Sequence, residues 1–344
     1  MTASTIPTTM SVPHFVGKGH IGVIQKPVGA PGSGQLLLQV KANALCGSER
    51  GQFANGSTVT PGHETAGIVV AAGPGTHTPI GTPGVVFLMD YCGDCRSCRL
   101  GFTNQCLNKR GDMGFNKDGG YGAFETVSEH IFFPVDDDIP LADATMLLDV
   151  MGTSAHAIKR GLQIRADVES VLITGSGPVG LGMLAMTKLL LGMATPVLIS
   201  DIVPYRLALA ERLGGVPIDL RNQNLIDGAR AAGFETVDMA IDTSGKTVAR
   251  QAALDLLGKR GALVCVGHGE EVHLTVSSML IAPERAVLGS EYFCFNELPA
   301  SLALLRTHRQ YLGQIITHRY PVSDIQHAFE LFFAGSTGKV VIEQ

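Results

Sequence analysis

The stretch Val171-Leu-Ile-Thr-Gly-Ser-Gly-Pro-Val-Gly180, with Pro196-Val-Leu-Ile-Ser-Asp201 after it, decides the fold. Residues 171–174 form a short apolar run of strand-forming types, and three glycines follow at the spacing G-x-G-x-x-G. Residues 181–191 are rich in the helix formers Leu, Met and Ala. A second apolar run then ends at an acid about twenty residues past the last glycine. This order predicts a βαβ unit that binds a dinucleotide.

The residue types in this unit suit a cofactor with a pyrophosphate. Gly175 allows a tight turn, Gly177 lets the phosphates approach the backbone, and Gly180 lets the helix pack against the strand. The helix N-terminus offers unpaired N–H groups and a positive dipole end. A glycine-rich turn without a ligand is the alternative. The candidate cofactor-binding residues, including two after a later predicted strand, are Gly175, Ser176, Gly177, Pro178, Val179, Gly180, Asp201, Arg206, Val266 and His268.

Asp201 favours NAD over NADP. Its carboxylate can accept hydrogen bonds from the ribose hydroxyls, whereas a 2′-phosphate would meet a like charge. Arg206 is close enough in sequence to leave NADP as the alternative.

The rest of the chain alternates in a way that predicts an α/β fold. Further buried strands are expected at residues 237–242, 261–267 and 286–290, with helices at 205–213 and 248–257 between them. Strands that alternate with helices make a doubly wound, Rossmann-type parallel sheet. The first third is expected to be mainly β, with strands at 35–41, 65–72, 84–89 and 119–134. Residues 142–162 are broadly helical with a break near Gly152.

The two ends of the chain are predicted to form one domain. Residues 314–344 read as a strand, a helix at 322–334 and a closing strand at 339–342, which we expect to return to the N-terminal β-region. The predicted domains are 1–152 with 291–344, and 153–290 for the dinucleotide. The first ten residues are Thr- and Ser-rich, lack the apolar core of a signal peptide, and are expected to be a disordered lead.

Composition excludes several classes of protein. The chain has 344 residues, 45% hydrophobic and 17% charged, which suits two well-cored domains. The net charge of −5 gives no basic footprint for nucleic acid. No uninterrupted apolar run is long enough for a membrane span. Seven cysteines without a signal peptide favour metal ligation in a reducing compartment, so we expect a cytoplasmic protein.

Four of the cysteines form a compact motif. Cys92, Cys95 and Cys98 follow the pattern C-x-x-C-x-x-C, and Cys106 comes after seven further residues. Four thiolates can close a tetrahedral zinc site that leaves no position for water, which makes such a site structural. An iron–sulfur cluster is the first alternative, but those motifs have a shorter last gap and a following proline, and here Leu107 follows. A zinc ribbon that contacts nucleic acid is the second.

A second set of candidate ligands is dispersed. Cys46, His63 with Glu64, and Asp149 lie far apart in the sequence. Alone, each has an ordinary structural explanation: a small core residue, a hydrogen-bonded core histidine, or an acid at the start of a helix. Taken separately, each of these residues is therefore ambiguous.

Together with the central fold, these residues resemble the zinc-dependent medium-chain alcohol dehydrogenase family. The motifs that carry the resemblance are Cys46-Gly-Ser48, Gly62-His-Glu64, the four-cysteine lobe, Asp149, the glycine turn and Asp201, and they follow the family order over residues 11–344. The branch that looks most similar contains the bacterial secondary-alcohol, polyol and threonine-type dehydrogenases.

The resemblance implies a fold and a set of roles. The mainly β domain would be GroES-like, and a catalytic zinc would be held by Cys46, His63 and Asp149, with Glu64 able to approach it. Ser48 would bind the zinc-bound alcohol and begin the proton relay. Two zinc ions per chain, NAD, and a homodimer or homotetramer are also implied.

Two positions depart from the family pattern. Glu49 replaces an Asp, and Gly51 stands where many members have a His, so a proton must leave through Ser48 and the cofactor ribose, through water, or through Glu49. An Arg is also missing before Tyr292, which weakens any case for sorbitol. Tyr292 and Phe293 are expected to line the substrate pocket, and further aromatic candidates are Phe53, Phe115 and Tyr121.

The sequence therefore predicts a zinc- and NAD-dependent dehydrogenase. Its substrate would be a small secondary alcohol or the matching ketone: a polyol, a cyclitol or a hydroxy-amino compound. The alternative is a non-catalytic dinucleotide-binding protein that keeps the fold. A nucleic-acid binder built on the cysteine lobe lacks basic surface beyond Arg96, Arg99, Lys109 and Arg110.

Overall fold

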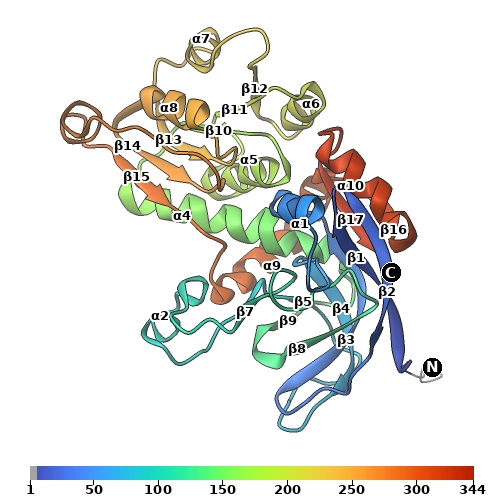
Figure 1. Cartoon of the computed structure of the whole chain (residues 1–344). Coiled ribbons are helices and arrows are strands. Elements are labelled where there is room, and N and C mark those ends of the chain that lie inside the picture. The colour runs from blue at the N-terminus through green and yellow to red at the C-terminus, as the bar shows by residue number, and fades with distance from the viewer. Residues whose placement is uncertain (1–5) are drawn as a thin grey trace.

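The computed structural model describes residues 6–344 of the chain (Figure 1). Half of the predicted disordered lead lies outside this range, but its last residues, Thr9 and Met10, already belong to the strand β1 (Thr9–Gly17). This strand pairs with β2 (His20–Pro27) as an antiparallel hairpin. The lead prediction is wrong for those two residues, because the backbone pairing of β1 begins at Thr9.

A six-stranded parallel sheet forms the predicted Rossmann-type unit. Its order is β12-β11-β10-β13-β14-β15, so the chain reverses direction across the sheet at β10. The strands are β10 (Val171–Thr174), β11 (Val197–Asp201), β12 (Val216–Asp219), β13 (Val237–Asp242), β14 (Leu257–Cys265) and β15 (Ala286–Gly289).

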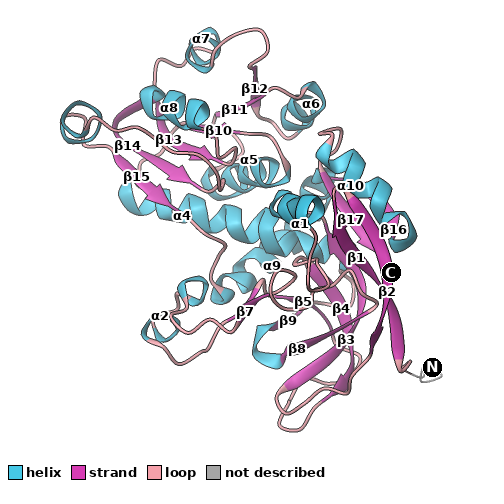
Figure 2. Ribbon diagram, viewed as in Figure 1, coloured by secondary structure: helices cyan, strands magenta, loops and turns pink. Residues whose placement is uncertain are grey.

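Both faces of this sheet are covered by helices, as continuous apolar strands require. In β10, Val171 and Ile173 belong to one buried cluster, and Leu172 belongs to another. Figure 2 shows helices above and below the sheet. The helices are α4 (Ser154–Ile164), α5 (Pro178–Leu191), α6 (Pro204–Arg212), α7 (Leu225–Ala231) and α8 (Thr247–Leu256). The doubly wound prediction is confirmed.

A second, seven-stranded sheet joins the two ends of the chain. Its order is β16-β17-β3-β4-β5-β9, with β8 also paired to β3. Val341 pairs with Ala44, so the C-terminal strand does return to the N-terminal region as predicted. The strands are β3 (Gln35–Ala44), β4 (Thr65–Ala72), β5 (Pro83–Val86), β8 (Phe124–Ser128), β9 (Phe132–Pro134), β16 (Ile316–Pro321) and β17 (Lys339–Glu343).

The cysteine-rich lobe projects from the second sheet (Figure 1). It contains only short elements, in keeping with a sequence that has no periodicity. These are β6 (Met89–Asp90), α2 (Arg96–Arg99), the 3₁₀ turn η2 (Thr103–Gln105) and β7 (Gly111–Asp112).

The helical region around Gly152 is less regular than predicted. It consists of α3 (Leu141–Ala144), the 3₁₀ turn η4 (Thr145–Leu147), the π-helical segment η5 (Leu148–Thr153) and then α4. A Cβ on Gly152 would lie 2.5 Å from the ring of Phe293, so only glycine allows this close approach. The predicted break is therefore a wide turn of helix packed against an aromatic ring.

Several elements were not predicted at all. The short helix α1 (Arg50–Asn55) follows the 3₁₀ turn η1 (Gly47–Glu49), where the sequence suggested only strands and turns. The others are β12, α7, α9 (Leu298–Leu312), and the 3₁₀ turns η3 (Glu129–Ile131), η7 (Phe295–Glu297) and η8 (Gly313–Ile315). A second π-helical segment, η6, spans Ser277–Ile281, and the 3₁₀ turn η9 (Val322–Asp324) begins the helix predicted at 322–334. The predicted C-terminal helix is α10 (Ile325–Phe333). Among residues 6–344, no helix is long and apolar enough to cross a membrane.

Candidate active site

Four of the predicted ligands meet at one point, although they come from three distant segments. Cys46 follows β3, His63 and Glu64 precede β4, and Asp149 lies in η5. Their ligand atoms all lie within 4.8 Å of one another. All four side chains are buried, which is unusual for such polar groups unless they bind one another or a metal.

The distances among three of these side chains fit a tetrahedral metal ion. Asp149 Oδ2 lies 3.3 Å from Cys46 Sγ and 3.2 Å from His63 Nε2. Bonds of about 2.0–2.3 Å to a tetrahedral zinc place ligand atoms roughly 3.5 Å apart. Thr153 Oγ1 donates a hydrogen bond of 3.0 Å to the other oxygen of Asp149, which fixes the carboxylate. Cys46, His63 and Asp149 therefore present a thiol, an imidazole and a carboxylate suited to zinc.

Glu49 supports this set through polar contacts with His63 and Cys46. Its Oε1 lies 3.3 Å from His63 Nδ1, and its Oε2 accepts hydrogen bonds from Tyr121 Oη at 2.9 Å and from the backbone N–H of Cys46. A carboxylate on the second nitrogen of a ligating histidine fixes the tautomer and the ring orientation. Glu49 is fully buried, so it has no contact with solvent through which to release a proton.

Burial and mutual charge perturb the titration of this set. Burial raises the pKa of Asp149, but the hydrogen bond with His63 and the charge of its ring outweigh this and lower the pKa to about 2. Burial alone would lower the pKa of His63, yet its contacts with Asp149, Cys46 and Glu49 raise it well above the ordinary value. Burial raises the pKa of the Cys46 thiol. The ligand set thus holds mobile protons that a bound cation would displace.

A buried lysine completes the electrostatics, and sequence reasoning missed it. Lys339, at the start of β17, is fully buried and its Nζ donates to Glu64 Oε1. Burial raises the pKa of Glu64 to about 7, although Lys339 opposes the shift. The sequence feature that could have revealed this pair is a lysine at the start of an apolar closing strand, Lys339-Val-Val-Ile342, because a cation buried there needs a partner.

Two aromatic residues adjoin the cluster. The ring of Phe115 lies 5.0 Å from that of His63. Tyr292 has a positive φ of 47°, a conformation that costs free energy in a non-glycine residue and is often found at functional sites. Burial raises its pKa, and the charges of His63 and Asp149 act on it. Phe115 and Tyr292 thus adjoin the ligand cluster, and their role in lining a substrate pocket stays a prediction.

Three other aromatic candidates lie in the hydrophobic core instead. Phe53 packs against Phe329 at 5.5 Å between ring centroids, in an aromatic cluster of the second sheet. Tyr121 is fully buried and stacks on Phe15. Phe293 is also fully buried and packs edge-on against Phe87 at 5.1 Å. The prediction that they line the pocket is wrong for Tyr121 and Phe293, whose rings are fully buried. Phe53 is only half-buried, and its place in the pocket stays a prediction.

The four lobe cysteines converge as their spacing predicted. The Sγ atoms of Cys92 and Cys98 lie 4.0 Å apart, as do those of Cys95 and Cys106. Zinc–sulfur bonds of about 2.3 Å place thiolates roughly 3.8 Å apart. Backbone N–H groups donate hydrogen bonds to the sulfur atoms of Cys92, Cys95 and Cys106. The bond from the N–H of Cys98 is the main reason that the pKa of Cys95 falls to about 6. The lobe is a closed four-sulfur site.

The glycine turn has the geometry that its sequence indicated. Gly175 has a φ of 91°, and a Cβ on Gly180 would lie 1.9 Å from the carbonyl oxygen of Gly175. Gly177 is the N-cap of α5, with Pro178 at the first turn, so Val179 and Gly180 lie in the first turn as well. Because a side chain at Gly177 would project into largely open space, the backbone there is accessible to phosphate groups.

Comparison with known proteins identifies the family. The alcohol dehydrogenase GroES-like domain matches residues 32–137, and the zinc-binding dehydrogenase domain matches residues 178–307. An L-threonine 3-dehydrogenase of Mesorhizobium japonicum is 30% identical over 331 residues, 92% of this chain and 93% of that protein. The chain belongs to the zinc-dependent medium-chain alcohol dehydrogenase family.

Solved structures share the whole fold. A protein of Escherichia coli CFT073, described as a short chain alcohol dehydrogenase complexed with NADH, superposes with a TM-score of 0.87 at 20% identity, covering 98% of this chain and 100% of that one. A putative zinc-binding dehydrogenase of Sinorhizobium meliloti 1021 bound to NADP gives 0.84 at 24% identity, covering 98% and 100%. These likenesses show the fold. The family models and the threonine dehydrogenase relative show that the chain is a zinc-dependent, NAD(P)-dependent alcohol oxidoreductase, and the non-catalytic alternative has no support.

The acid at the end of β11 is tied to the glycine turn. Asp201 Oδ2 accepts hydrogen bonds from the backbone N–H of Ser176 at 2.6 Å and from its hydroxyl at 2.8 Å. Arg206 reaches the same place from α6: its Nη1 lies 3.8 Å from where a Cβ on Gly177 would be. Burial lowers the pKa of Arg206, and the charge of Asp201 opposes this. Both predicted determinants of cofactor choice therefore stand beside the turn.

A buried ion pair lies at the carboxyl end of β13, and sequence reasoning missed it. Arg250 Nε donates to Asp242 Oδ2 at 2.7 Å, and Asp242 Oδ1 also accepts from Thr174 Oγ1 at 2.7 Å. The guanidinium further binds the carbonyl oxygens of Gly267 and Glu270. This network fixes the loop after β14, which carries the predicted residues Val266 and His268. The sequence feature that could have revealed it is an acid at the end of each of two strands, β11 and β13, which flank β10.

Proposed function

We propose that the chain oxidises a small secondary alcohol to a ketone with NAD, and the reverse, at the site formed by Cys46, His63 and Asp149. The observation that carries the proposal is the convergence of these three buried side chains, with Asp149 Oδ2 3.3 Å from Cys46 Sγ and 3.2 Å from His63 Nε2. When bound, zinc acts as a Lewis acid toward the alcohol oxygen, and NAD accepts the hydride.

The roles of the other residues follow from their positions. Ser48 is exposed on η1, two residues from Cys46, and takes the proton of the substrate hydroxyl. Glu49 holds the ring of His63 in place and, being buried, does not carry the proton onward. Gly51 is exposed and has no side chain, so the proton leaves Ser48 through the cofactor ribose or water. Glu64, paired with Lys339, stays beside the ligands as a further carboxylate.

The substrate is a polar secondary alcohol such as a polyol, a cyclitol or a hydroxy-amino compound. Tyr292 and Phe115 adjoin the cluster, and together they offer an apolar surface with one hydroxyl. The threonine dehydrogenase relative supports a hydroxy-amino compound within this group.

We further propose two domains: a catalytic domain of residues 1–152 with 291–344, and a dinucleotide domain of residues 153–290. We also propose that the protein is cytoplasmic and forms a homodimer or homotetramer.

Replacing Cys46 with Ala tests the site. We expect dehydrogenase activity to fall on the order of 10³-fold, because one of three ligands to the catalytic ion is lost. Zinc per chain should fall from about two to about one. Activity is followed as NADH absorbance with a panel of secondary alcohols. Cys294→Ala is the matched control, a buried cysteine outside both sets of zinc ligands. Full activity in Cys46→Ala would sink the proposal.

Replacing Asp201 with Ala tests the preference for NAD. Removal of the carboxylate should lower the ratio of kcat/KM for NAD to that for NADP by about tenfold or more, because the ribose hydroxyls lose their acceptor and Arg206 is left to attract a 2′-phosphate. Glu211→Ala, an exposed acid at the other end of α6, serves as the control. An unchanged ratio would show that Asp201 does not contact the ribose.

A further inference from the structure

Tyr292, which adjoins the Cys46 cluster, lies in a segment with a strained backbone. Residues 290–294 connect β15 to η7, and Tyr292 has a φ of 47°. The ring of the next residue, Phe293, packs on Gly152 of η5, the segment that also carries Asp149. A positive φ at a non-glycine residue costs free energy and persists only where the surrounding structure fixes the backbone. The position of Tyr292 therefore depends on the contacts that its neighbours in the chain make.

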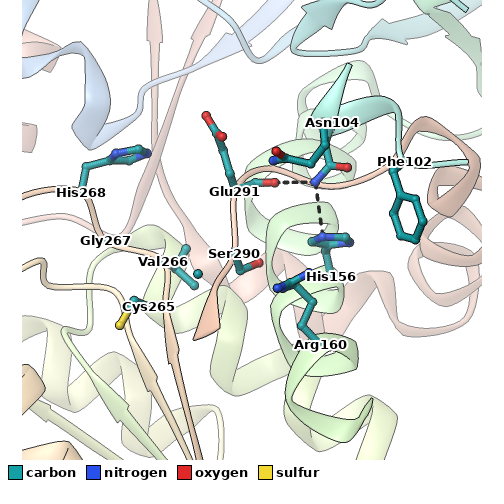
Figure 3. Close-up of a pocket in the computed structure, with 12 residues that line it drawn as sticks. Phe102, Asn104, His156, Arg160, Cys265, Val266, Gly267, His268, Ser290 and Glu291 are labelled. Atoms are coloured by element: carbon teal, nitrogen blue, oxygen red, sulfur yellow. Dashed lines mark hydrogen bonds between the residues drawn. The ribbon is translucent and has the colours of Figure 1, made fainter. Parts of the chain in front are cut away.

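Asn104 of the cysteine-rich lobe binds this segment directly before Tyr292. It lies in η2 and is 6% exposed. Its Nδ2 donates to the carbonyl oxygen of Glu291 at 2.8 Å, and Figure 3 shows the amide between Glu291 and His156 of α4, with both contacts as dashed lines. That carbonyl belongs to the planar peptide unit between Glu291 and Tyr292. The hydrogen bond from Asn104 therefore restrains the φ of Tyr292.

A second residue of η2, Thr103, binds the segment on the other side of Tyr292. Its Oγ1 accepts a hydrogen bond of 2.8 Å from the backbone N–H of Phe295, and the residue is 7% exposed. The segment is fixed at its start by Ser290, whose N–H donates to the carbonyl oxygen of Cys265 in β14 at 2.9 Å. Tyr292 thus lies between two anchors from the lobe and one from the parallel sheet.

A closed set of hydrogen bonds keeps Asn104 in this orientation. Its Nδ2 lies 3.3 Å from His156 Nε2, and the Nδ1 of His156 donates to Glu297 Oε2 at 2.8 Å. The same oxygen accepts from the backbone N–H of Cys294 at 2.8 Å, and Lys159 balances the charge of Glu297 at 3.0 Å. The thiol of Cys294 adds only a weak hydrogen bond to Asn104 Oδ1, so Cys294→Ala leaves the backbone contacts in place. The amide of Asn104 therefore has one fixed position.

We propose that Asn104 is a positioning residue for the alcohol site, which fixes Tyr292 beside the zinc ligands through the carbonyl group of Glu291. The inference rests on the proposed function, in which Tyr292 adjoins the substrate. Asn104 stands two residues before Cys106, so closure of the four-cysteine site also fixes Asn104. The lobe thereby sets the affinity for the alcohol, while the rate at saturation stays a property of the catalytic ligands.

Substrate kinetics of Asn104→Ala test the proposal. The zinc-loaded wild type and the variant are compared at saturating NAD, with the secondary alcohol that the wild type oxidises fastest in the panel used for Cys46→Ala. We expect KM for the alcohol to rise by about tenfold while kcat changes by less than about threefold, because a displaced pocket residue weakens binding of substrate and transition state alike. The zinc content should stay at about two per chain, since all the cysteine ligands remain.

A double variant shows whether Asn104 acts through Tyr292. Once Tyr292 is replaced by Ala, Asn104 has no side chain to position. Adding Asn104→Ala to Tyr292→Ala should therefore change KM by less than about twofold. A rise of about tenfold that persists in the Tyr292→Ala background would overturn the proposal.

Thr103 offers a second pair of variants that does not depend on how well Asn104→Ala folds. Thr103→Val has the same shape but lacks the acceptor for the N–H of Phe295, and it should raise KM by about threefold. Thr103→Ser keeps the hydroxyl and should have a KM near that of the wild type. Asn108→Ala, an exposed asparagine of the same lobe, is the control and should behave as the wild type does. Equal KM values in Thr103→Val and Thr103→Ser would contradict the proposal.

Failure of this inference is distinguishable from failure of the proposed function. A wild type that oxidises no secondary alcohol contradicts the function and, with it, the inference. An active wild type whose KM is unchanged by Asn104→Ala contradicts the inference alone.

Discussion

The four-cysteine lobe and the Cys46 cluster bring potential zinc ligands together by opposite means. The lobe ligands lie within 14 positions of one another, and they are held by short turns whose backbone N–H groups point at the sulfur atoms. The Cys46 cluster spans 103 positions from Cys46 to Asp149 and is held by side chains. The lobe is a local structure, whereas the cluster exists only when the second sheet and η5 are in place.

The two regions also differ in how their charges are balanced. Three of the four lobe cysteines are half-exposed, so water shares the solvation of their thiolates. The cluster is buried together with Glu49, Glu64 and Lys339, and each of these charges depends on a neighbour. We therefore expect substitutions of the lobe cysteines to lower the zinc content and the stability. Substitutions in the cluster should alter both catalysis and folding.

Cys95→Ser should produce the largest loss of stability among the lobe variants. Cys95 has the most backbone support, with its Sγ accepting from the N–H groups of Cys98 and Leu107. We expect about one zinc per chain to be lost and the melting temperature to fall by more than about 5 °C, since a structural zinc site contributes folding free energy directly. The kcat at 20 °C should stay within about threefold of the wild type. Metal analysis and calorimetry measure the effect.

Cys265→Ser provides the control, because Cys265 belongs to neither set of ligands. It should leave the zinc content and the melting temperature near those of the wild type. Loss of all activity in Cys95→Ser at an unchanged melting temperature would break the distinction between the two regions.

Lys339→Met should destabilise the protein by about 3–5 kcal/mol, since it leaves the carboxylate of Glu64 buried without a counter-ion. The effect should be larger at pH 8 than at pH 6. Without Lys339 the pKa of Glu64, about 7 in the intact protein, rises further, and holding the charge becomes harder as the pH increases. Urea unfolding at the two pH values gives the free energies.

The double variant Lys339→Met/Glu64→Gln sharpens this prediction. It removes the stranded charge together with its partner, so most of the lost stability should return. A double variant as unstable as Lys339→Met would mean that Lys339 acts through its packing and not through Glu64.

The same contrast explains how much the sequence could predict. The βαβ unit and the lobe are local patterns, in which Gly175, Gly177 and Gly180 or the four cysteines stand at fixed spacings. Cys46, His63 and Asp149 could be proposed as ligands only through the resemblance, because no local spacing connects them. Lys339 and Arg250 were missed because the partner of a buried cation is set by strand order and not by sequence distance.

The aromatic residues show a different limit. Aromatic side chains suit both a pocket and a core, as is the case for Phe53, Tyr121 and Phe293. Which side of a strand or turn faces the core depends on the register of the strand, and the residue type alone does not give it. Gly152 explains the position of Phe293, since the ring occupies the space that a Cβ would need. The π-helical turn η5, which directs both Asp149 and Thr153 toward the cluster, has no signature in the sequence that periodicity could reveal.

Glu125 gives the smallest effect and the clearest test of why the Cys46 cluster needs its partners. It is buried on β8, and among residues 6–344 no Lys, Arg or His lies within ion-pair distance of it. Burial raises its pKa from 4.5 to about 8, although the Thr65 hydroxyl opposes the shift. The folded protein therefore keeps a proton that the unfolded chain releases above pH 4.5. Because of this proton, the free energy of unfolding should be greatest below pH 4.5 and decline by a few kcal/mol as the pH rises to about 8.

Glu125→Gln, which is neutral at every pH, should lose this decline, whereas Glu271→Gln, an exposed control, should keep it. Urea unfolding between pH 5.5 and about 8.5 measures both slopes, and equal slopes in the wild type and Glu125→Gln would mean that Glu125 is ionised in the fold without a cation. A buried carboxylate would then need no partner in this domain, and the pairing of Glu64 with Lys339 would require another explanation.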